Sequence, residues 1–265
     1  MESKYLFEGK DSYRTPESNK ASLLFRLMFR SRWYFYFINF TVFIRCGLCA
    51  AKGKLNKQMQ IYYSNLNLLL IEKCGGKIQI DGLEHLRALN GTPVVLIGNH
   101  MSLIETAVFH ALAREYIDFS FIIKESLLRV PFFRHIMIAM KAVPVGRINP
   151  REDLKTVLVK GKSVLEEGRC IIVFPQATRA ASFEPENFNT IGIKLAKSAG
   201  VKVVPFALKT DFLGIGKRFR DLGPVHPEKV VHFEFAPAME ITGNGQEQHK
   251  AIIDFIQSRF DEWNK

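Results

Sequence analysis

Cysteine is scarce in this 265-residue sequence, which contains four. Cys46 and Cys49 form a C-x-x-C pair, but no second pair follows at the spacing of a zinc site. Both lie among Phe, Ile, Leu and Ala, a setting that favours buried, inert thiols over a redox or metal centre. The seven histidines form neither H-E-x-x-H nor a compact Cys/His cluster. We therefore expect no bound metal, and the scattered thiols fit a reducing compartment.

Acidic residues are outnumbered, with 26 Asp and Glu against 37 Lys and Arg, which gives a formal net charge of +11. The excess is uneven, because residues 1–60 hold eleven basic and four acidic side chains. A basic segment indicates an anionic partner, which could be nucleic acid, a membrane surface or an acidic substrate. Hydrophobic residues make up 47% of the chain, so a substantial core is available and global disorder is excluded as a description.

A long apolar run is also missing. Residues 33–44 form about a dozen apolar or aromatic positions interrupted by Asn39, whereas a spanning helix needs about 20. Cations flank this run on both sides, and aromatic residues between cations suit the headgroup layer of a membrane. The flanking cations are Arg26, Arg30, Arg32, Arg45, Lys52, Lys54 and Lys57.

These features favour a membrane partner over nucleic acid. We predict that residues 21–75 form a helical membrane-associating segment, a monotopic anchor of one helix or a helical hairpin. The alternatives are a helix buried in the protein core beside a rim of basic residues and a single membrane-spanning helix. Residues 1–20 are polar and are expected to be a poorly ordered arm. No secretory-signal pattern opens the chain, so we place the protein on the cytoplasmic face of a membrane.

From about residue 76 the apolar pattern alternates between strand-like and helix-like stretches. This alternation predicts an α/β domain over residues 76–265, with a mixed sheet flanked by helices. The expected strands are 77–80, 94–98, 119–123, 142–145, 170–174, 201–208 and 230–235. The expected helices are 56–73, 102–114, 131–140, 151–167, 189–199 and 247–263.

The stretch NHMSLIETAVFH at residues 99–110 places a histidine at a strand-to-helix junction, where α/β sheets usually bind ligands. On one continuous helix His100 and Glu105 would point about 140° apart. They can meet only if His100 precedes the helix and Glu105 lies in its first turn. The carboxylate would then hold one imidazole nitrogen and leave the other as a general base. This arrangement is that of a catalytic triad without its serine, and no G-x-S-x-G elbow is present.

A structural interpretation of the same residues is equally open. Ser102 to Glu105 fits S-x-x-E, a capping box with Ser102 as N-cap and Glu105 as its partner. Glu105 could then serve only the backbone N–H groups at the start of the helix. His110, on the same predicted helix, is more simply explained as a structural histidine. The spacing alone does not choose between a cap and a catalytic pair.

Further stretches follow in order: FIIKESLLRVPFF at 121–133, VPVGRIN at 143–149, FPQATRA at 174–180 and VKVVPFAL at 201–208. With the first stretch, they make the sequence resemble the glycerolipid acyltransferases, the family that includes lysophosphatidic acid acyltransferase. The resemblance covers roughly residues 80–210. The family's NHxSxxD motif is matched by Asn99, His100 and Ser102, with Glu105 in the place of the acid. Its FPEGTRS motif is matched by Phe174, Pro175, Thr178 and Arg179.

The resemblance implies acyl transfer to the free hydroxyl of a lysophospholipid, with lysophosphatidic acid as the first choice of acceptor and another lysolipid as the alternative. The donor would be acyl-CoA or acyl carrier protein, a co-substrate, and no further cofactor is expected. His100 would take the hydroxyl proton, Glu105 would orient and charge-stabilise His100, and no acyl-enzyme would form.

The resemblance also implies an acceptor site. Arg179 matches the arginine that binds the acceptor's phosphate, and Arg147 matches the arginine of the second motif. Lys124 follows a predicted strand in the same way, and Gln176 and Thr178 belong to the same motif as Arg179. Guanidinium suits a phosphate through its fork of donors.

The residues that differ from the family pattern lie in the motif that binds the headgroup of the acceptor. Gln176, Ala177 and Ala180 replace Glu, Gly and Ser in the acceptor-binding motif. The acceptor headgroup is therefore the part of the assignment that the motif supports least. A non-catalytic basic protein that binds lipid or nucleic acid is the rival hypothesis. It explains the charge but not a histidine and an acid placed at a strand end.

Overall fold

The computed structural model describes residues 6–176 and 178–265, which form an eight-stranded sheet with helices on both faces. The strand order is β1-β2-β8-β7-β3-β6-β4-β5. Neighbours are parallel except for the antiparallel pairs β1–β2 and β7–β8, so the expected mixed sheet is confirmed. The strands are β1 Tyr13–Arg14, β2 Ile78–Asp81, β3 Val95–Gly98, β4 Phe119–Lys124, β5 Val143–Val145, β6 Cys170–Val173, β7 Val203–Lys209 and β8 Val231–Phe235.

The helices predicted by range match the structure to within a few residues. Short elements without a predicted range are β1, α1, α4 and the 3₁₀ helices Glu125–Arg129 and Pro185–Asn187. The predicted helix 151–167 is continuous in space but has a π-helical turn, Val157–Gly161, between α7 and α8. The helices are α1 Leu23–Leu27, α2 Arg32–Ala51, α3 Lys57–Lys73, α4 Leu83–Arg87, α5 Ile104–Ala113, α6 Phe133–Ala139, α7 Pro150–Thr156, α8 Lys162–Glu166, α9 Ile191–Ala199 and α10 Gln246–Trp263.

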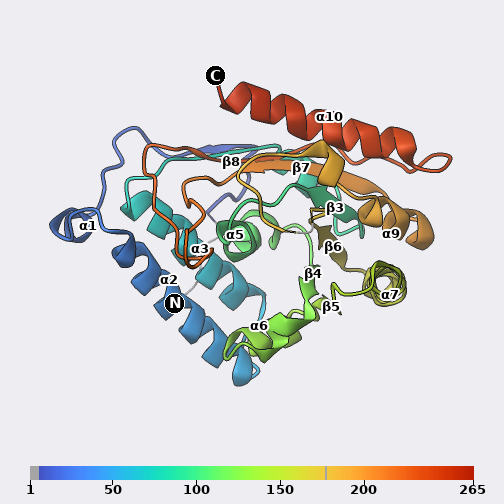
Figure 1. Ribbon diagram of the computed structural model, residues 1–265, viewed down its shortest axis with the longest axis horizontal. Coiled ribbons are helices and arrows are strands. Elements are labelled where there is room, and N and C mark those ends of the chain that lie inside the picture. The colour runs from blue at the N-terminus through green and yellow to red at the C-terminus, as the bar shows by residue number, and fades with distance from the viewer. Residues whose placement is uncertain (1–5, 177) are drawn as a thin grey trace.

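The two faces of the sheet are covered by different helices (Figure 1). The strands β3 and β6 are short β-branched runs in which every residue is buried, as expected for parallel strands covered on both sides. On one face, Phe109 of α5 packs edge-on against four rings from the three strands β4, β7 and β8, which are Phe119, Phe121, Phe206 and Phe235. The opposite face is covered by α10 (Figure 1).

Residues 6–20 differ from the poorly ordered arm that was expected. Tyr13 and Arg14 pair with β2, Phe7 is almost fully buried, and Arg14 forms an ion pair with Asp81 at 2.8 Å. The Tyr13 hydroxyl donates to Glu72 at 2.7 Å. The expectation failed because β2 offers an unpaired sheet edge, and two aromatic side chains are enough to hold a polar segment against it.

The N-terminal helices have one packed and one exposed face. The helix α2 begins after Ser31, whose hydroxyl accepts from the Trp33 N–H at 3.3 Å, and packs against α3 and α6 (Figure 1). In the described part of the chain it is the one helix that is long and apolar enough to cross a membrane. Its other face exposes Trp33, Phe37 and Phe40. The helix therefore joins the α/β domain without being enclosed by it.

Candidate active site

His100 and Glu105 meet at the junction between β3 and α5. The strand ends at Gly98 and the helix begins at Ile104, so His100 stands before the helix and Glu105 in its first turn. The Glu105 carboxylate is fully buried and contacts His100 Nδ1. His100 Nε2 has no hydrogen-bond partner in residues 6–176 and 178–265, and the ring lines a large cavity. One imidazole nitrogen is thus held by the acid, and the other is open to a ligand.

Glu105 also serves the start of α5. Its Oε1 accepts from the N–H groups of Met101 at 3.0 Å and Ser102 at 2.6 Å, and from the Thr210 hydroxyl. Ser102 is not the N-cap, which is Leu103, although its hydroxyl accepts from the Ile104 N–H at 3.2 Å. These bonds satisfy a buried carboxylate that would otherwise be costly. Capping and contact with His100 are therefore roles of the same side chain and do not exclude each other.

The His100 ring and backbone are held by two other segments. The ring stacks on Phe174, with centroids 4.3 Å apart and planes 22° apart. Gln176 Oε1 accepts from the His100 N–H at 2.9 Å, and the Ala180 N–H donates to the His100 carbonyl at 3.1 Å. The loop that follows β6 thus clamps the histidine in place. Sequence reasoning assigned Gln176 to the substrate, and the structure adds a positioning contact.

Asn99 anchors the same turn to β7. Its side-chain amide donates to the Leu208 carbonyl at 2.8 Å and its oxygen accepts from the Leu208 N–H at 2.9 Å. Thr210, directly after β7, bonds both Glu105 and the Ser102 hydroxyl, the latter at 2.9 Å. Neither role was predicted from the sequence. The signal for Thr210 was only its position directly after a strand beside β3.

The predicted cations come from the carboxyl ends of neighbouring strands. Lys124 ends β4, Arg147 follows β5 and Arg179 follows β6, and these three strands lie in one parallel run with β3. Burial lowers the pKa of the Arg147 guanidinium, Asp153 raises it and Arg179 lowers it, so the two arginines lie within electrostatic reach of each other. The predicted site residues that line one cavity are His100, Lys124, Arg147, Gln176, Thr178 and Arg179, with Glu105 behind His100.

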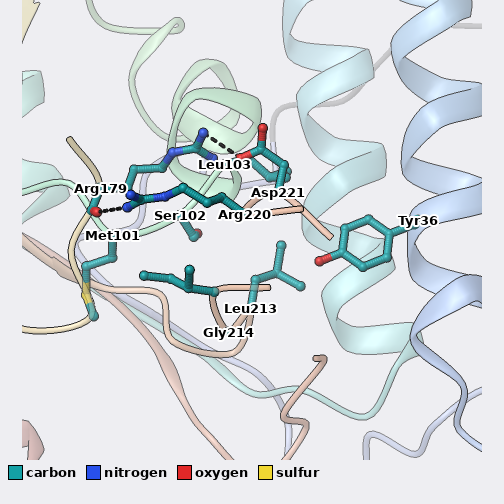
Figure 2. Close-up of a pocket in the computed structure, with 10 residues that line it drawn as sticks. Tyr36, Met101, Ser102, Leu103, Arg179, Leu213, Gly214, Arg220 and Asp221 are labelled. Carbon is teal, nitrogen blue, oxygen red and sulfur yellow. Dashed lines mark hydrogen bonds and ion pairs between the residues drawn. The ribbon is translucent and has the colours of Figure 1, made fainter. Parts of the chain in front are cut away.

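Arg179 has partners that the sequence did not indicate (Figure 2). Its guanidinium forms an ion pair with Asp221 at 2.5 Å, and Arg220 donates to its carbonyl at 2.9 Å. Both partners lie about 40 residues further along the chain, in a loop after β7, and no local pattern marks them. Of the three departures from the family pattern, Ala177 lies outside the described residues.

The cavity beside His100 has a volume of about 1220 Å³, above the usual range of roughly 300–1,000 Å³ for ligand pockets. Its mouth carries the polar groups just described. Away from them its walls are mainly apolar, and they come from α2, α3, α5, α6 and β4. The apolar lining includes Phe40, Val42, Phe43, Tyr63, Leu103, Ala107, Phe133, Ile136 and Met137. A ligand with a long apolar part and an anionic head would match this distribution.

In chemical terms, the arrangement can remove a proton from a hydroxyl group and stabilise negative charge beside it. Fold and site together define an acyltransferase: a family model described as Acyltransferase matches residues 77–209, about half of the chain, and the chain belongs to this family. The resemblance drawn from the sequence motifs is thereby confirmed.

The most similar relatives include three 1-acyl-sn-glycerol-3-phosphate acyltransferases. The one from Pseudomonas aeruginosa is 28% identical over 189 residues, which cover 71% of this chain and 68% of that protein. The chloroplast enzyme of Arabidopsis thaliana is 31% identical over 53% of this chain and 37% of its own length. The one from Borreliella burgdorferi is 31% identical over 51% of this chain and 52% of its own.

The fold is shared with a solved structure. The 1-acyl-sn-glycerophosphate (LPA) acyltransferase PlsC from Thermotoga maritima superimposes with a TM-score of 0.67 over 88% of this chain and 94% of that one. The identity is 19%, so this likeness is one of fold.

Proposed function

We propose that this protein transfers a fatty acyl group from an acyl-CoA or acyl carrier protein thioester to the free hydroxyl of lysophosphatidic acid, which gives phosphatidic acid. The observation that carries the proposal is the buried Glu105 carboxylate on His100 Nδ1, at the mouth of a cavity that also holds Arg147 and Arg179. The names of the relatives support the choice of acceptor.

The reaction runs through His100 without an acyl-enzyme. Nε2 takes the proton of the acceptor hydroxyl as its oxygen attacks the thioester carbonyl. The tetrahedral intermediate collapses, the carbon–sulfur bond breaks, and the leaving thiolate takes the proton back from the imidazolium. Glu105 keeps Nδ1 protonated and stabilises the imidazolium. Cations beside the ring favour the developing oxyanion.

The acceptor's phosphate is assigned to the cationic mouth. Arg179 and Arg147 offer planar forks of donors that match phosphate oxygens, and Lys124 adds a point charge at the end of β4. Burial, as the main cause, and Arg179 lower the pKa of the Arg147 guanidinium while Asp153 raises it, so the phosphate of an acceptor would favour its charged form. Thr178 and Gln176 add polar groups at the same mouth.

The apolar end of the cavity is assigned to the acyl chain. One wall comes from α2, which also forms part of the exposed apolar surface, and Phe40 belongs to both. Exposed apolar residues gather on α1, on α2 and in the turn between them: Leu23, Leu24, Leu27, Met28, Phe29, Trp33, Phe37 and Phe40. Arg26, Arg30 and Arg32 alternate with them, so this surface fits the headgroup layer of an anionic membrane. We therefore propose a monotopic enzyme on the cytoplasmic face, which takes its lipid substrate from the bilayer.

Acyl transfer by the purified protein tests the proposal. A panel of lysolipid acceptors, each with acyl-CoA and acyl carrier protein donors, should show transfer to lysophosphatidic acid. His100→Ala should abolish it, whereas His85→Ala, which removes a histidine on α4 outside the cavity, should leave it unchanged. Undiminished transfer by His100→Ala removes His100 from the chemistry. Salt-sensitive binding to vesicles or DNA without thioester consumption would favour the non-catalytic rival.

A different lysolipid acceptor is the second candidate, because Gln176 and Ala180 depart from the family motif at the headgroup. Arg179→Ala against the same acceptor panel separates the two. A loss confined to acceptors with a phosphate monoester supports lysophosphatidic acid. An equal loss for all acceptors assigns Arg179 to another task.

A further inference from the structure

The loop of residues 214–223, between β7 and β8, lies over the segment that carries Arg179 (Figure 2). The loop is closed at its base, where Gly214 donates to the Pro224 carbonyl at 2.9 Å and Leu213 bridges to Val225. The chain crosses itself so closely that a Cβ at Gly223 would stand 1.7 Å from the Gly214 carbonyl oxygen. This geometry indicates that the loop has one fixed backbone conformation.

The loop is also tied to the helix that carries the exposed apolar surface. The Tyr36 hydroxyl of α2 donates to the Gly223 carbonyl at 3.1 Å. Tyr36, Arg179, Arg220 and Asp221 enclose a small pocket of about 20 Å³ beside the start of α5 (Figure 2). The loop therefore has a fixed place between α2 and the cationic mouth.

Two neighbouring residues of this loop make opposite contacts with Arg179. Arg220 donates to the Arg179 carbonyl at 2.9 Å, which fixes the backbone of the segment and brings another cation to the mouth. Asp221 pairs with the Arg179 guanidinium at 2.5 Å, so it occupies donors that an acceptor's phosphate needs. Both side chains line the large cavity as well.

Asp221 and the phosphate of an acceptor compete for the Arg179 guanidinium, and the stronger of the two ionic interactions determines which anion is bound. The Asp221 side chain is 58% exposed and that of Arg179 31%, and an exposed pair of this kind contributes a factor of about five or less to an equilibrium. A phosphate monoester carries more negative charge than a carboxylate, offers three acceptor oxygens and meets Arg147 at the same time. A carboxylate left beside that dianion would repel it. The phosphate should therefore displace Asp221.

We propose that Arg220 and Asp221 of the 214–223 loop belong to the acceptor-headgroup site, in which Asp221 is the displaceable counter-ion of Arg179 and Arg220 holds the Arg179 segment and adds a cation for the phosphate. The inference rests on the proposed function and deepens it. A neutral headgroup cannot displace Asp221, so the loop selects for a phosphate monoester. This role differs from that of a permanent orienting partner, whose removal would weaken phosphate binding.

Binding of inorganic phosphate, measured by titration calorimetry on the full chain, is the first test because it needs no turnover. Asp221→Asn should tighten phosphate binding by a factor of about five or less, because it removes the competing charge. Arg220→Gln should weaken it. Arg218→Gln is the matched control, since Arg218 is exposed on the same loop and lies over Phe219 at 5.8 Å, and it should change nothing.

Steady-state kinetics supply the second readout. Asp221→Asn should lower the KM for lysophosphatidic acid with kcat unchanged, and should leave the KM for a monoacylglycerol acceptor where it was. Weaker or unaltered phosphate binding by Asp221→Asn would overturn the displacement role. The two proposals can fail separately. If phosphate binding follows the expected order among the wild type and its variants, but the wild type transfers no acyl group to any acceptor, the proposed reaction is refuted and the anion site remains supported.

Discussion

Replacing Glu105 by glutamine probes the His100–Glu105 pair directly. Glutamate and glutamine side chains have the same shape and differ only in that an NH₂ group replaces one carboxylate oxygen. In the structure Oε1 accepts hydrogen bonds from Met101, Ser102 and Thr210, while Oε2 contacts His100 Nδ1. A glutamine can keep all the bonds to Oε1 by placing its carbonyl oxygen there. Its NH₂ group then faces His100.

An amide donor at Nδ1 reverses the protonation of the ring. Nδ1 becomes the acceptor, the neutral imidazole carries its proton on Nε2, and Nε2 cannot take a proton from the acceptor hydroxyl. The corresponding change from acid to amide lowers kcat by about 10⁴ in Ser-His-Asp triads. Glu105 is fully buried, so water cannot replace the lost charge. We expect kcat to fall by about 10³ to 10⁴, or roughly 4–5.5 kcal/mol in activation free energy.

The assay is thiol release from the acyl donor at saturating substrates, with thermal unfolding followed on the same samples. The melting temperature should change little, because the hydrogen bonds at the start of α5 remain. Glu105→Asp is the charge-conserving control and should keep more activity than Glu105→Gln, since a carboxylate still faces Nδ1. If Glu105→Gln retains more than about a tenth of the wild-type rate, the acid serves only the helix start and the reasoning is refuted.

Three further changes test the pH dependence, the membrane surface and the packing behind the site. Burial is the main cause that lowers the pKa of His110 from 6.5 to about 3. Between these two pH values the unfolded state binds more protons than the folded state, so the stability of the fold falls as the pH drops from 6.5 towards 3. At pH 5 this costs about 2 kcal/mol, and His110→Phe should flatten the decline in melting temperature between pH 7 and 5; an equally steep decline contradicts the assignment. Phe37→Ser removes an exposed ring of α2 and should lower the binding of the protein to anionic vesicles, measured by co-sedimentation, about tenfold or more. The control Val159→Ser, at an exposed apolar site on another helix, should not lower it. Equal losses for the two variants would place the membrane surface elsewhere. Gly98→Ala places a Cβ 2.3 Å from the Phe206 ring and 2.5 Å from its carbonyl oxygen, so we expect a loss of about 1–3 kcal/mol in denaturant unfolding, and unchanged stability would mean that β7 moves aside freely.

Secondary structure was predictable where the pattern is local. The β-branched runs of β3 and β6 and the Asn149–Pro150 start of α7 carry their own boundaries, and the structure places them close to the expected residues. The two-residue strand β1 has no such pattern. It exists because β2 offers an edge that lies more than 60 residues away in the sequence, and its aromatic neighbours fill space beside it.

The order of residues was enough to predict which groups come together at the junction. His100 before a helix and Glu105 in its first turn are within reach of each other, and cations that follow parallel strands gather at the carboxyl ends of those strands. The same spacing also fitted a helix cap, and Glu105 has both roles in the structure. The first result comes from short-range geometry, which the residue order specifies, and the second needs only that the strands are parallel.

The contacts that hold these groups in place, in contrast, follow from the three-dimensional fold. Thr210 reaches Glu105 across 105 positions of chain, Gln176 reaches the His100 backbone across 76, and Arg220 reaches the Arg179 carbonyl across 41. Such contacts depend on which strands lie side by side, here β3 between β6 and β7. Strand order is set by the packing of the whole core, and no local pattern of residues encodes it.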